Sequence, residues 1–218
     1  MNGARFLNLS SSFPNFASFA NTERDIGELK AEIVRKSLHF LIALSPSMAS
    51  VNRPLTVLIL IAGTLGYTFM EYLRLSGVKV PVVSSITSMA SRSRDAGRFV
   101  MGPVTLGLGA LLALLLYPSP VAAISIYALA FGDGFASLVG KFFGKWRPAF
   151  LFGKSVEGSM ACFAAVLISA YAVSGSMHIA IIAASTATVV EAMPLEDYDN
   201  MALPVTVGFV VQLASSVL

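Results

Sequence analysis

Charged side chains are scarce in this chain of 218 residues, because Asp, Glu, Lys and Arg together make up only 12% of it. Soluble domains carry roughly 25% charged residues, whereas 56% of the residues here are hydrophobic. The composition therefore excludes an ordinary water-soluble domain and favours an integral membrane protein of one domain. Cysteine is nearly absent as well. Cys162 stands alone, which excludes an intramolecular disulfide, and its apolar surroundings favour a small core residue.

The N-terminal region lacks the features of a secretory signal. Residues 1–27 are rich in Ser, Asn and Phe, contain no uninterrupted apolar stretch, and include Pro14. We predict a flexible or interfacial arm over residues 1–27, followed by a single transmembrane domain over residues 28–218.

Seven segments are long and apolar enough to be read as membrane spans of about 20 residues. They cover residues 33–50, 54–73, 99–117, 120–141, 157–174, 177–193 and 201–218. The predicted fold is therefore all-α, a polytopic membrane protein with about seven transmembrane helices. Residues 78–90 are too short and too rich in Ser to span, so we expect a re-entrant or interfacial segment there.

The distribution of positive charge predicts the orientation. Of the 15 Lys and Arg residues, Arg53 alone falls in a predicted outer connection. Because cytoplasmic loops carry the excess of Lys and Arg, we expect a cytoplasmic N-terminus, an external C-terminus, and all ionic clusters on the cytoplasmic side. Trp146, between Lys145 and Arg147, is typical of an interfacial anchor.

Asp133 interrupts the apolar run of residues 123–144. A carboxylate at the centre of a bilayer helix costs roughly 2.5–3.5 kcal/mol on insertion scales, so such a residue indicates function. The flanking Gly132 and Gly134 permit an unwound turn and close backbone approach. We expect a Mg²⁺ or ribose site at Asp133. The alternative is a buried carboxylate paired with a neighbouring Arg.

The segment FGKSVEGS, residues 152–159, contains a second candidate site. Gly153, Lys154 and Ser155 resemble the end of a P-loop, but that motif requires a Gly where Pro148 stands, so the segment is not one. A Gly-rich turn that opens a helix nevertheless offers backbone N–H groups to phosphate, and Lys154 adds a positive charge. Arg98, at the start of a predicted span, is a further candidate for phosphate contact.

A basic face precedes the first predicted span. Glu32, Arg35, Lys36 and His39 follow one another at helical spacing and share one face. The face is either a ladder of ion pairs within the helix or a surface that binds polyphosphate.

An acidic stretch lies between the last two predicted spans, where Lys and Arg are missing. Its acids are Glu191, Glu196, Asp197 and Asp199. Mg²⁺ takes carboxylate and water oxygens and usually shares them with substrate phosphates. We expect Glu191, Asp199 and Asn200 to meet Asp133 across the bundle, whereas Glu196 and Asp197 are interpreted as solvated charges.

Five motifs in this order resemble the family of CTP-dependent lipid-alcohol kinases, which includes dolichol, phytol and farnesol kinases and a CTP-using diacylglycerol kinase. They are RKSLHF, FGDGFASLVGKFFGK, FGKSVEGS, Glu191 and DNMALP. The resemblance covers residues 28–210. It implies transfer of the γ-phosphoryl group of CTP to a hydroxyl of a membrane lipid, with Mg²⁺ or another divalent cation and without nucleic acid. A polyprenol, a phytol-type alcohol and diacylglycerol remain open as the lipid.

With the reasoning above, the resemblance implies roles for individual residues. The catalytic candidates are Asp133, Glu191 and Lys154, with Asp133 or Glu191 accepting the hydroxyl proton. The metal candidates are Asp133, Asp199 and Glu191. The nucleotide candidates are Lys36, His39, Arg98, Gly132, Gly134, Gly153, Lys154, Ser155, Glu157 and Asn200. The segment EAMPLEDYDN departs from the family pattern, in which this turn carries fewer acids.

Two other functions stay open. A phosphatidate cytidylyltransferase also uses CTP in the membrane, but its C-terminal signature is absent from this chain. A small membrane transporter also places carboxylates inside the membrane. A transport pathway, however, should carry ionic groups near the midplane or on both sides, whereas here they gather on one side.

Overall fold

The computed structural model describes residues 30–78 and 97–217, and within them every regular element is a helix, without strands. This confirms the all-α class. After a helix over residues 30–42, the elements are α2 Ser45–Leu75, α4 Gly102–Leu116, α5 Ser119–Tyr127, η3 Ala128–Asp133, α6 Gly134–Phe142, η4 Ala149–Leu151, α7 Val156–Ser174, α8 Met177–Ala192, η5 Glu196–Tyr198 and α9 Asp199–Val217. The predicted arm over residues 1–27 and residues 79–90 of the predicted re-entrant segment lie outside the described residues.

The last five predicted spans match observed helices to within a few residues, but the first two do not. The chain turns at residues 43–44, inside the predicted span 33–50. The predicted break between residues 50 and 54 is instead a kink within α2, where Asn52 has φ −152° and ψ 94°. The side chain of Asn52 accepts the N–H of Leu55 at 3.0 Å and so starts the second part of the helix.

Within residues 30–78 and 97–217, three helical segments are long and apolar enough to cross a bilayer: Ser45–Leu75, Ser119–Phe142 and Val156–Ser174. α4 and α8 are apolar but shorter. The protein is therefore a membrane protein by the length and composition of its helices. The count of seven crossings and the orientation of the two termini stay predictions.

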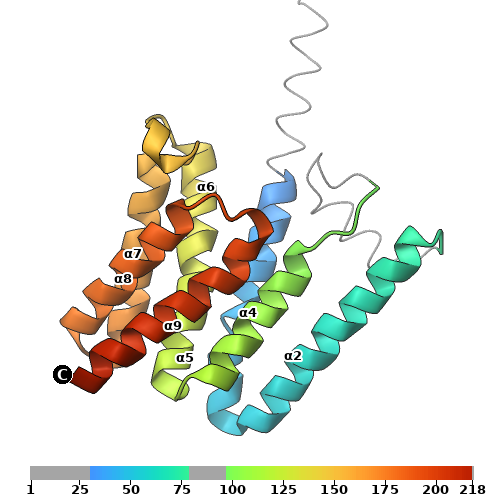
Figure 1. Ribbon diagram of the computed structural model, residues 1–218, viewed down its shortest axis with the longest axis horizontal. Helices are drawn as coiled ribbons and strands as arrows, with labels where there is room; N and C mark the ends of the chain where they lie inside the picture. The colour runs from blue at the N-terminus through green and yellow to red at the C-terminus, as the bar shows by residue number, and fades with distance from the viewer. Residues whose placement is uncertain (1–29, 79–96, 218) are drawn as a thin grey trace, which may run out of the picture.

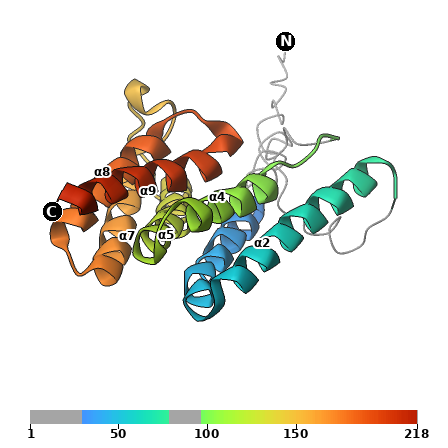
Figure 2. The same cartoon turned by 60° about the horizontal axis from the view of Figure 1, so that its bottom comes forward.

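Successive long helices run in alternating directions, so that helix ends distant in the sequence gather at one end of the bundle (Figure 1). At that end lie the start of the 30–42 helix, the end of α2, the starts of α4, α7 and α9, and the ends of α6 and α8 (Figure 1). The turn at residues 43–44 and the C-terminal end of α9 lie at the opposite end. Figure 2 shows the same arrangement from a second side.

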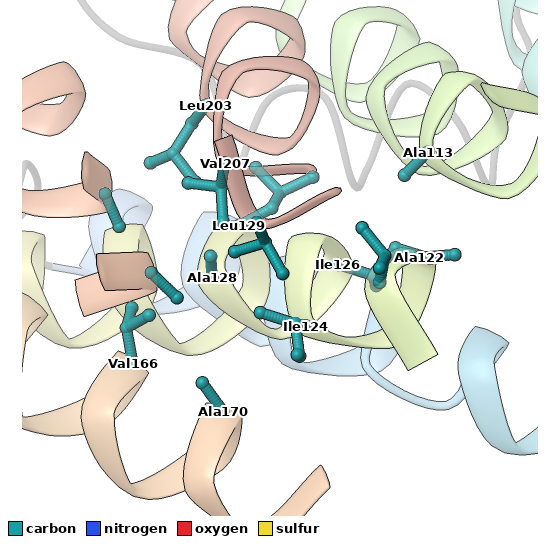
Figure 3. Close-up of a cluster of buried hydrophobic side chains, with 14 of the residues drawn as sticks. Ala113, Ala122, Ile124, Ile126, Ala128, Leu129, Val166, Ala170, Leu203 and Val207 are labelled. Carbon is teal, nitrogen blue, oxygen red and sulfur yellow. The ribbon is translucent and has the colours of Figure 1, made fainter. Parts of the chain in front are cut away.

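The continuous segment α5–η3–α6 forms the centre of the bundle. About two thirds of its most apolar window is buried (67%), against 11% for α2 and 22% for α7. Its side chains pack against small and branched side chains of the surrounding helices. Leu129 of η3, Val166 of α7 and Val207 of α9 belong to this core (Figure 3). A helix that is apolar on every side is expected to be enclosed by others. Asp133 is therefore carried by the most enclosed helix among the described elements.

Arg53, the exception to the predicted charge asymmetry, has a structural role. Its guanidinium group donates hydrogen bonds to the carbonyl oxygens of Leu114 and Tyr117, the latter at 2.8 Å. These carbonyls belong to the C-terminal end of α4, where the last backbone acceptors lack partners within the helix. A cation is also favoured there by the helix dipole. The positively charged Arg53 thus stabilises the C-terminal end of α4.

Several glycines allow helices to approach closely, as expected for a membrane bundle. A Cβ atom on Gly107 would lie 2.2 Å from the hydroxyl of Thr64 in α2, and one on Gly109 would lie 2.0 Å from the carbonyl oxygen of Asn200 in α9. Gly63 and Gly66 do not have this close-packing role, because a Cβ atom there would meet nothing within 4 Å.

Candidate functional site

A cavity of about 230 Å³ opens at the end of the bundle where the ionic residues gather. It is lined by the 30–42 helix, α2, α4, α6, α7, α8 and α9 and by the loops between them. Nine residues predicted for the site line it: Lys36, His39, Asp133, Gly153, Lys154, Ser155, Glu191, Asp199 and Asn200. The cavity thus joins residues of all five motifs of the sequence, Glu191 among them.

Asp133 is held by two residues of the 30–42 helix. Its Oδ2 atom lies 2.5 Å from Nζ of Lys36 and 3.0 Å from Nδ1 of His39. All three side chains are buried. Lys36 and His39 are three residues apart and therefore share a helix face. The alternative expected from the sequence was a buried carboxylate paired with a neighbouring Arg. The carboxylate of Asp133 is buried and paired, but its partners are a Lys and a His.

The backbone around Asp133 explains how the 30–42 helix comes so close. A Cβ atom on Gly134 would lie 2.8 Å from the ring of Phe40, and one on Gly132 would lie 2.8 Å from a methyl group of Val166. The two glycines therefore seat Asp133 between the 30–42 helix and α7. Neither of them lines the cavity. The chain is not unwound as expected, but forms the π-helical turn η3, which ends at Asp133. Such turns occur frequently at functional sites.

Lys154 and Glu191 form a second ion pair in the cavity lining. Nζ of Lys154 lies 2.7 Å from Oε1 of Glu191 and also donates to the carbonyl oxygen of the same residue. The Lys154 side chain is 31% exposed, against 6% for Glu191. The Lys154 side chain thus reaches solvent, while its partner at the end of α8 is enclosed.

Ser155 forms the N-cap of α7, directly after Lys154. Its hydroxyl accepts the backbone N–H of Gly158 at 3.1 Å. Before it, Phe152 and Gly153 have φ of 50° and 88°, and this left-handed turn brings the chain sharply into α7. Gly158 lies against α6, because a Cβ there would be 2.7 Å from the carbonyl oxygen of Ala136. The expected glycine-rich turn that opens a helix is present at the cavity wall.

Four of the residues predicted to bind nucleotide lie outside the cavity lining: Gly132, Gly134, Glu157 and Arg98. Glu157 accepts backbone N–H groups of Lys145 at 3.0 Å and Trp146 at 3.3 Å, and so fastens the loop before α7. Arg98 is exposed, and its carbonyl oxygen accepts a hydrogen bond from Arg74. Their assignment to the nucleotide stays a prediction.

Asp199 and Asn200 begin α9 and complete the cavity wall. Burial, together with the negative charge of Asp133, raises the pKa of Asp199 to about 7. Nδ2 of the buried Asn200 donates to Oγ1 of Thr105 at 2.9 Å, which joins α9 to α4. A carboxyl group with so high a pKa needs a nearby cation to be fully ionised at neutral pH.

The three carboxylates predicted to bind metal do not form a closed metal centre. In residues 30–78 and 97–217, no group of three or more His, Cys, Asp or Glu side chains is close enough to hold a metal ion. Asp133 is engaged by Lys36, and Glu191 by Lys154. The donor set fits a Mg²⁺ ion that takes one or two carboxylates and completes its shell with phosphate and water oxygens.

Arg147 is a cavity residue that the sequence analysis did not assign to the site. Its guanidinium group donates to the carbonyl oxygen of Gly153 at 2.6 Å and to that of Gly140 at 2.7 Å. It thereby joins the end of α6 to the turn before α7. The signal was its place in a basic loop between two glycine-rich motifs. Lys141, which lies 3.3 Å from Glu32, also lines the cavity and was not assigned.

Glu71 fastens the far wall of the cavity. This fully buried carboxylate accepts two hydrogen bonds from Arg74, each 2.7 Å long, and the backbone N–H of Val100 at 3.0 Å. The hydroxyl of Tyr67 donates to the carbonyl oxygen of Val100 at 3.3 Å. Tyr67 and Val100 both line the cavity. The network fixes the chain that leads into α4.

Comparison with known proteins gives relatives for this chain. A probable chloroplastic phytol kinase of Triticum aestivum is 30% identical over 141 residues, which are 56% of this chain and 46% of that protein. Phytol kinase 1 of Arabidopsis thaliana, also chloroplastic, is 26% identical over 60% of this chain and 49% of its own length. An uncharacterized protein of Methanocaldococcus jannaschii is 26% identical over 83% and 92%.

The matches to the two phytol kinases cover only part of each protein. The chain spans about half the length of the two phytol kinases that it matches. No family model and no solved structure matches it. The expected resemblance to lipid-alcohol kinases is confirmed by the two phytol kinases, and no cytidylyltransferase is among the relatives described above.

Proposed function

We propose that this protein transfers a phosphoryl group from a nucleoside triphosphate to the hydroxyl group of an isoprenoid alcohol in the membrane, with CTP as the donor. The observation that carries this proposal is the single cavity shared by Lys36, Asp133, Lys154, Glu191 and Asp199 at one end of an apolar bundle. The two relatives named phytol kinases favour an isoprenoid alcohol. CTP follows from the motif resemblance.

Phosphoryl transfer depends on positioning and on neutralising negative charge, and little covalent chemistry falls to the protein. Lys154 stands immediately before the N-cap of α7, where backbone N–H groups and the helix dipole favour phosphate. Arg147 lines the same wall. In this proposal the triphosphate occupies that wall, and Lys154 exchanges the carboxylate of Glu191 for a phosphate oxygen.

Asp199 would hold Mg²⁺ together with phosphate oxygens, and Glu191 would join it once Lys154 has turned to the phosphate. A bound Mg²⁺ ion would neutralise charge on the terminal phosphates. Asp133, fixed by Lys36 and His39, would accept the proton of the lipid hydroxyl. The alcohol then reaches the cavity at the end of the bundle while its tail stays among apolar helices.

The test is a transfer assay with the purified protein in lipid nanodiscs. CTP labelled at the γ-phosphate is offered with phytol, geranylgeraniol, a polyprenol or diacylglycerol, and the lipid products are separated by chromatography. We expect γ-label in the phosphate ester of an isoprenoid alcohol. Transfer of α-label to phosphatidate would establish a cytidylyltransferase instead. Absence of nucleotide binding would reject both enzymes and return the transporter to consideration.

A further inference from the structure

The loop between α6 and α7 exposes an unusual number of aromatic rings. Within residues 142–152, hereafter the 142–152 loop, five aromatic side chains are at least half exposed: Phe142 50%, Phe143 68%, Trp146 65%, Phe150 71% and Phe152 64%. Exposed apolar groups of this density mark a surface that contacts a membrane or a partner.

Hydrogen bonds to the loop backbone hold it against the start of α7, so these rings do not turn inward. The backbone N–H of Val156 donates to the carbonyl oxygen of Trp146 at 2.9 Å, and Glu157 accepts the N–H of Lys145. Arg147 joins the loop to the ends of α6 and of the turn at Gly153. Phe152 holds φ 50°, a rare value for a bulky residue. The interior of the loop is thus occupied by backbone hydrogen bonds and its aromatic rings face outward.

The position of the loop in the chain identifies what it contacts. One candidate span ends at Phe142 and the next begins at Val156. The loop between them therefore begins and ends at the boundary of the bilayer. Aromatic rings concentrate at that boundary, where an apolar face meets the headgroups. Lys141 and Lys145 add positive charge beside the rings, which favours anionic headgroups.

We propose that the 142–152 loop is a docking surface for anionic lipid headgroups. The mouth of the cavity then lies against these headgroups. Arg147 belongs to the loop, and Lys154 follows it by two residues, and both line the cavity. Contact of the loop with the headgroups therefore holds the cavity at the depth where headgroups lie. This inference does not depend on the reaction that the cavity performs.

The chain offers a direct probe, because Trp146 is its single tryptophan. The full-length protein is reconstituted in phosphatidylcholine vesicles that contain lipids brominated near the headgroup or near the chain end. We expect blue-shifted emission, stronger quenching by the shallow label than by the deep one, and protection from aqueous iodide. Red-shifted emission that iodide quenches would overturn the proposal. Protection from iodide without quenching by either lipid would overturn it too, because a protein would then cover the loop.

The charge of the headgroup is tested separately. Brominated phosphatidylglycerol and brominated phosphatidylcholine are compared at equal mole fraction. Each basic residue near an anionic surface favours the anionic lipid by about fivefold. We expect Lys145→Gln to reduce the preference by about that factor, whereas Lys30→Gln at the start of the 30–42 helix leaves it unchanged. Equal quenching by the two lipids in the unchanged protein would overturn the anionic part of the proposal.

The aromatic rings are tested by replacement. The double variant Phe150→Ser and Phe152→Ser should shift the Trp146 emission to the red and weaken quenching by the shallow label. Phe209→Ser on α9, where the side chain is 57% exposed, is the matched control and should change neither. Unchanged emission in the folded double variant would contradict the role of the rings. If the double variant does not fold, the two quenching measurements on the unchanged protein still decide the proposal.

Discussion

The cavity is lined by two ion pairs that differ in how deeply they are buried. In the first, the side chains of Lys36 and Asp133 are only 6% and 7% exposed. In the second, Lys154 is 31% exposed while Glu191 is 6% exposed. A fully enclosed pair is costly to separate, because each partner would be left as an uncompensated charge. The second pair can open, since water or phosphate can replace the carboxylate at Lys154.

In the proposed reaction, the difference would give the two pairs distinct tasks within one cavity. The pair of Lys36 and Asp133 is held by His39 and by the contact between Gly134 and Phe40, and would position the base. The pair of Lys154 and Glu191 would keep a cation and an anion in place until a ligand with both phosphate and metal separates them. The following variants test this comparison.

The largest effect is expected for Asp133→Asn, which breaks the enclosed pair. Transfer to lipid should fall at least about a hundredfold, because a positioned base is lost. Stability should fall by about 3–5 kcal/mol, because Lys36 remains buried without its partner. Activity with γ-labelled CTP and thermal unfolding of the solubilised protein measure the two losses.

A double variant separates the two causes. Adding Lys36→Met to Asp133→Asn removes both charges and should restore much of the thermal stability, while activity stays lost. Recovery of activity together with stability would show that Asp133 has only a structural role.

Lys154→Met opens the second pair and should act mainly on the nucleotide. Loss of one charge-assisted hydrogen bond costs about 1.5–3 kcal/mol, so CTP affinity should fall roughly tenfold to a hundredfold. The loss of thermal stability should be smaller than for Asp133→Asn, since the Lys154 side chain is already partly exposed. Titration of the purified protein with CTP measures the affinity. An unchanged dissociation constant would remove Lys154 from the triphosphate site.

Gly134→Ala tests how the enclosed pair is positioned. The new Cβ would meet the ring of Phe40 at 2.8 Å and push the 30–42 helix away from Asp133. Such overpacking costs about 1–3 kcal/mol, and transfer activity should decrease with it. Gly63→Ala is the control, because nothing lies within 4 Å of its Cβ position. Equal activity and unfolding temperature in the two variants would contradict this account of the packing.

Glu191→Gln should have the smallest effect on CTP binding, and it should raise the affinity rather than lower it. Removing the carboxylate that competes for Lys154 should raise the affinity for metal-free CTP by about fivefold, equivalent to about 1 kcal/mol. Dependence on Mg²⁺ should weaken at the same time. A decrease in affinity for metal-free CTP would show that Glu191 does not compete with phosphate at Lys154.

Much of this arrangement followed from local features of the sequence. The ends of α4, α7, α8 and α9 match the limits of apolar runs to within a few residues. Pro118 after α4 and Gly175 after α7 interrupt helices through their own backbone preferences. The turn at residues 43–44 was missed, although Pro46 in the first turn of α2 is typical of a helix start. The hydrogen bonds by which the carboxylate of Glu157 fastens the loop before α7 did not follow from its motif, and its assignment to the nucleotide stays a prediction.

The partners within the cavity did not follow from local features. Lys36 and Asp133 are 97 positions apart, and Lys154 and Glu191 are 37 apart. Nothing near either acid indicates which cation it meets. The contacts depend on how closely two helices approach, and therefore on whether a neighbour packs against a glycine. Gly134 has such a neighbour and Gly63 does not, although both are helical glycines in apolar segments.

The sequence by itself determined that this protein is helical and embedded in a membrane, and that its few charges collect where helices end. Long apolar runs leave the backbone no other way to satisfy its hydrogen bonds in lipid, and charge is tolerated chiefly at the ends. The tertiary structure alone decided which acid binds which base and which residues line the cavity. Those choices arise from helix packing between distant segments, where a single methyl group sets the distance between helices.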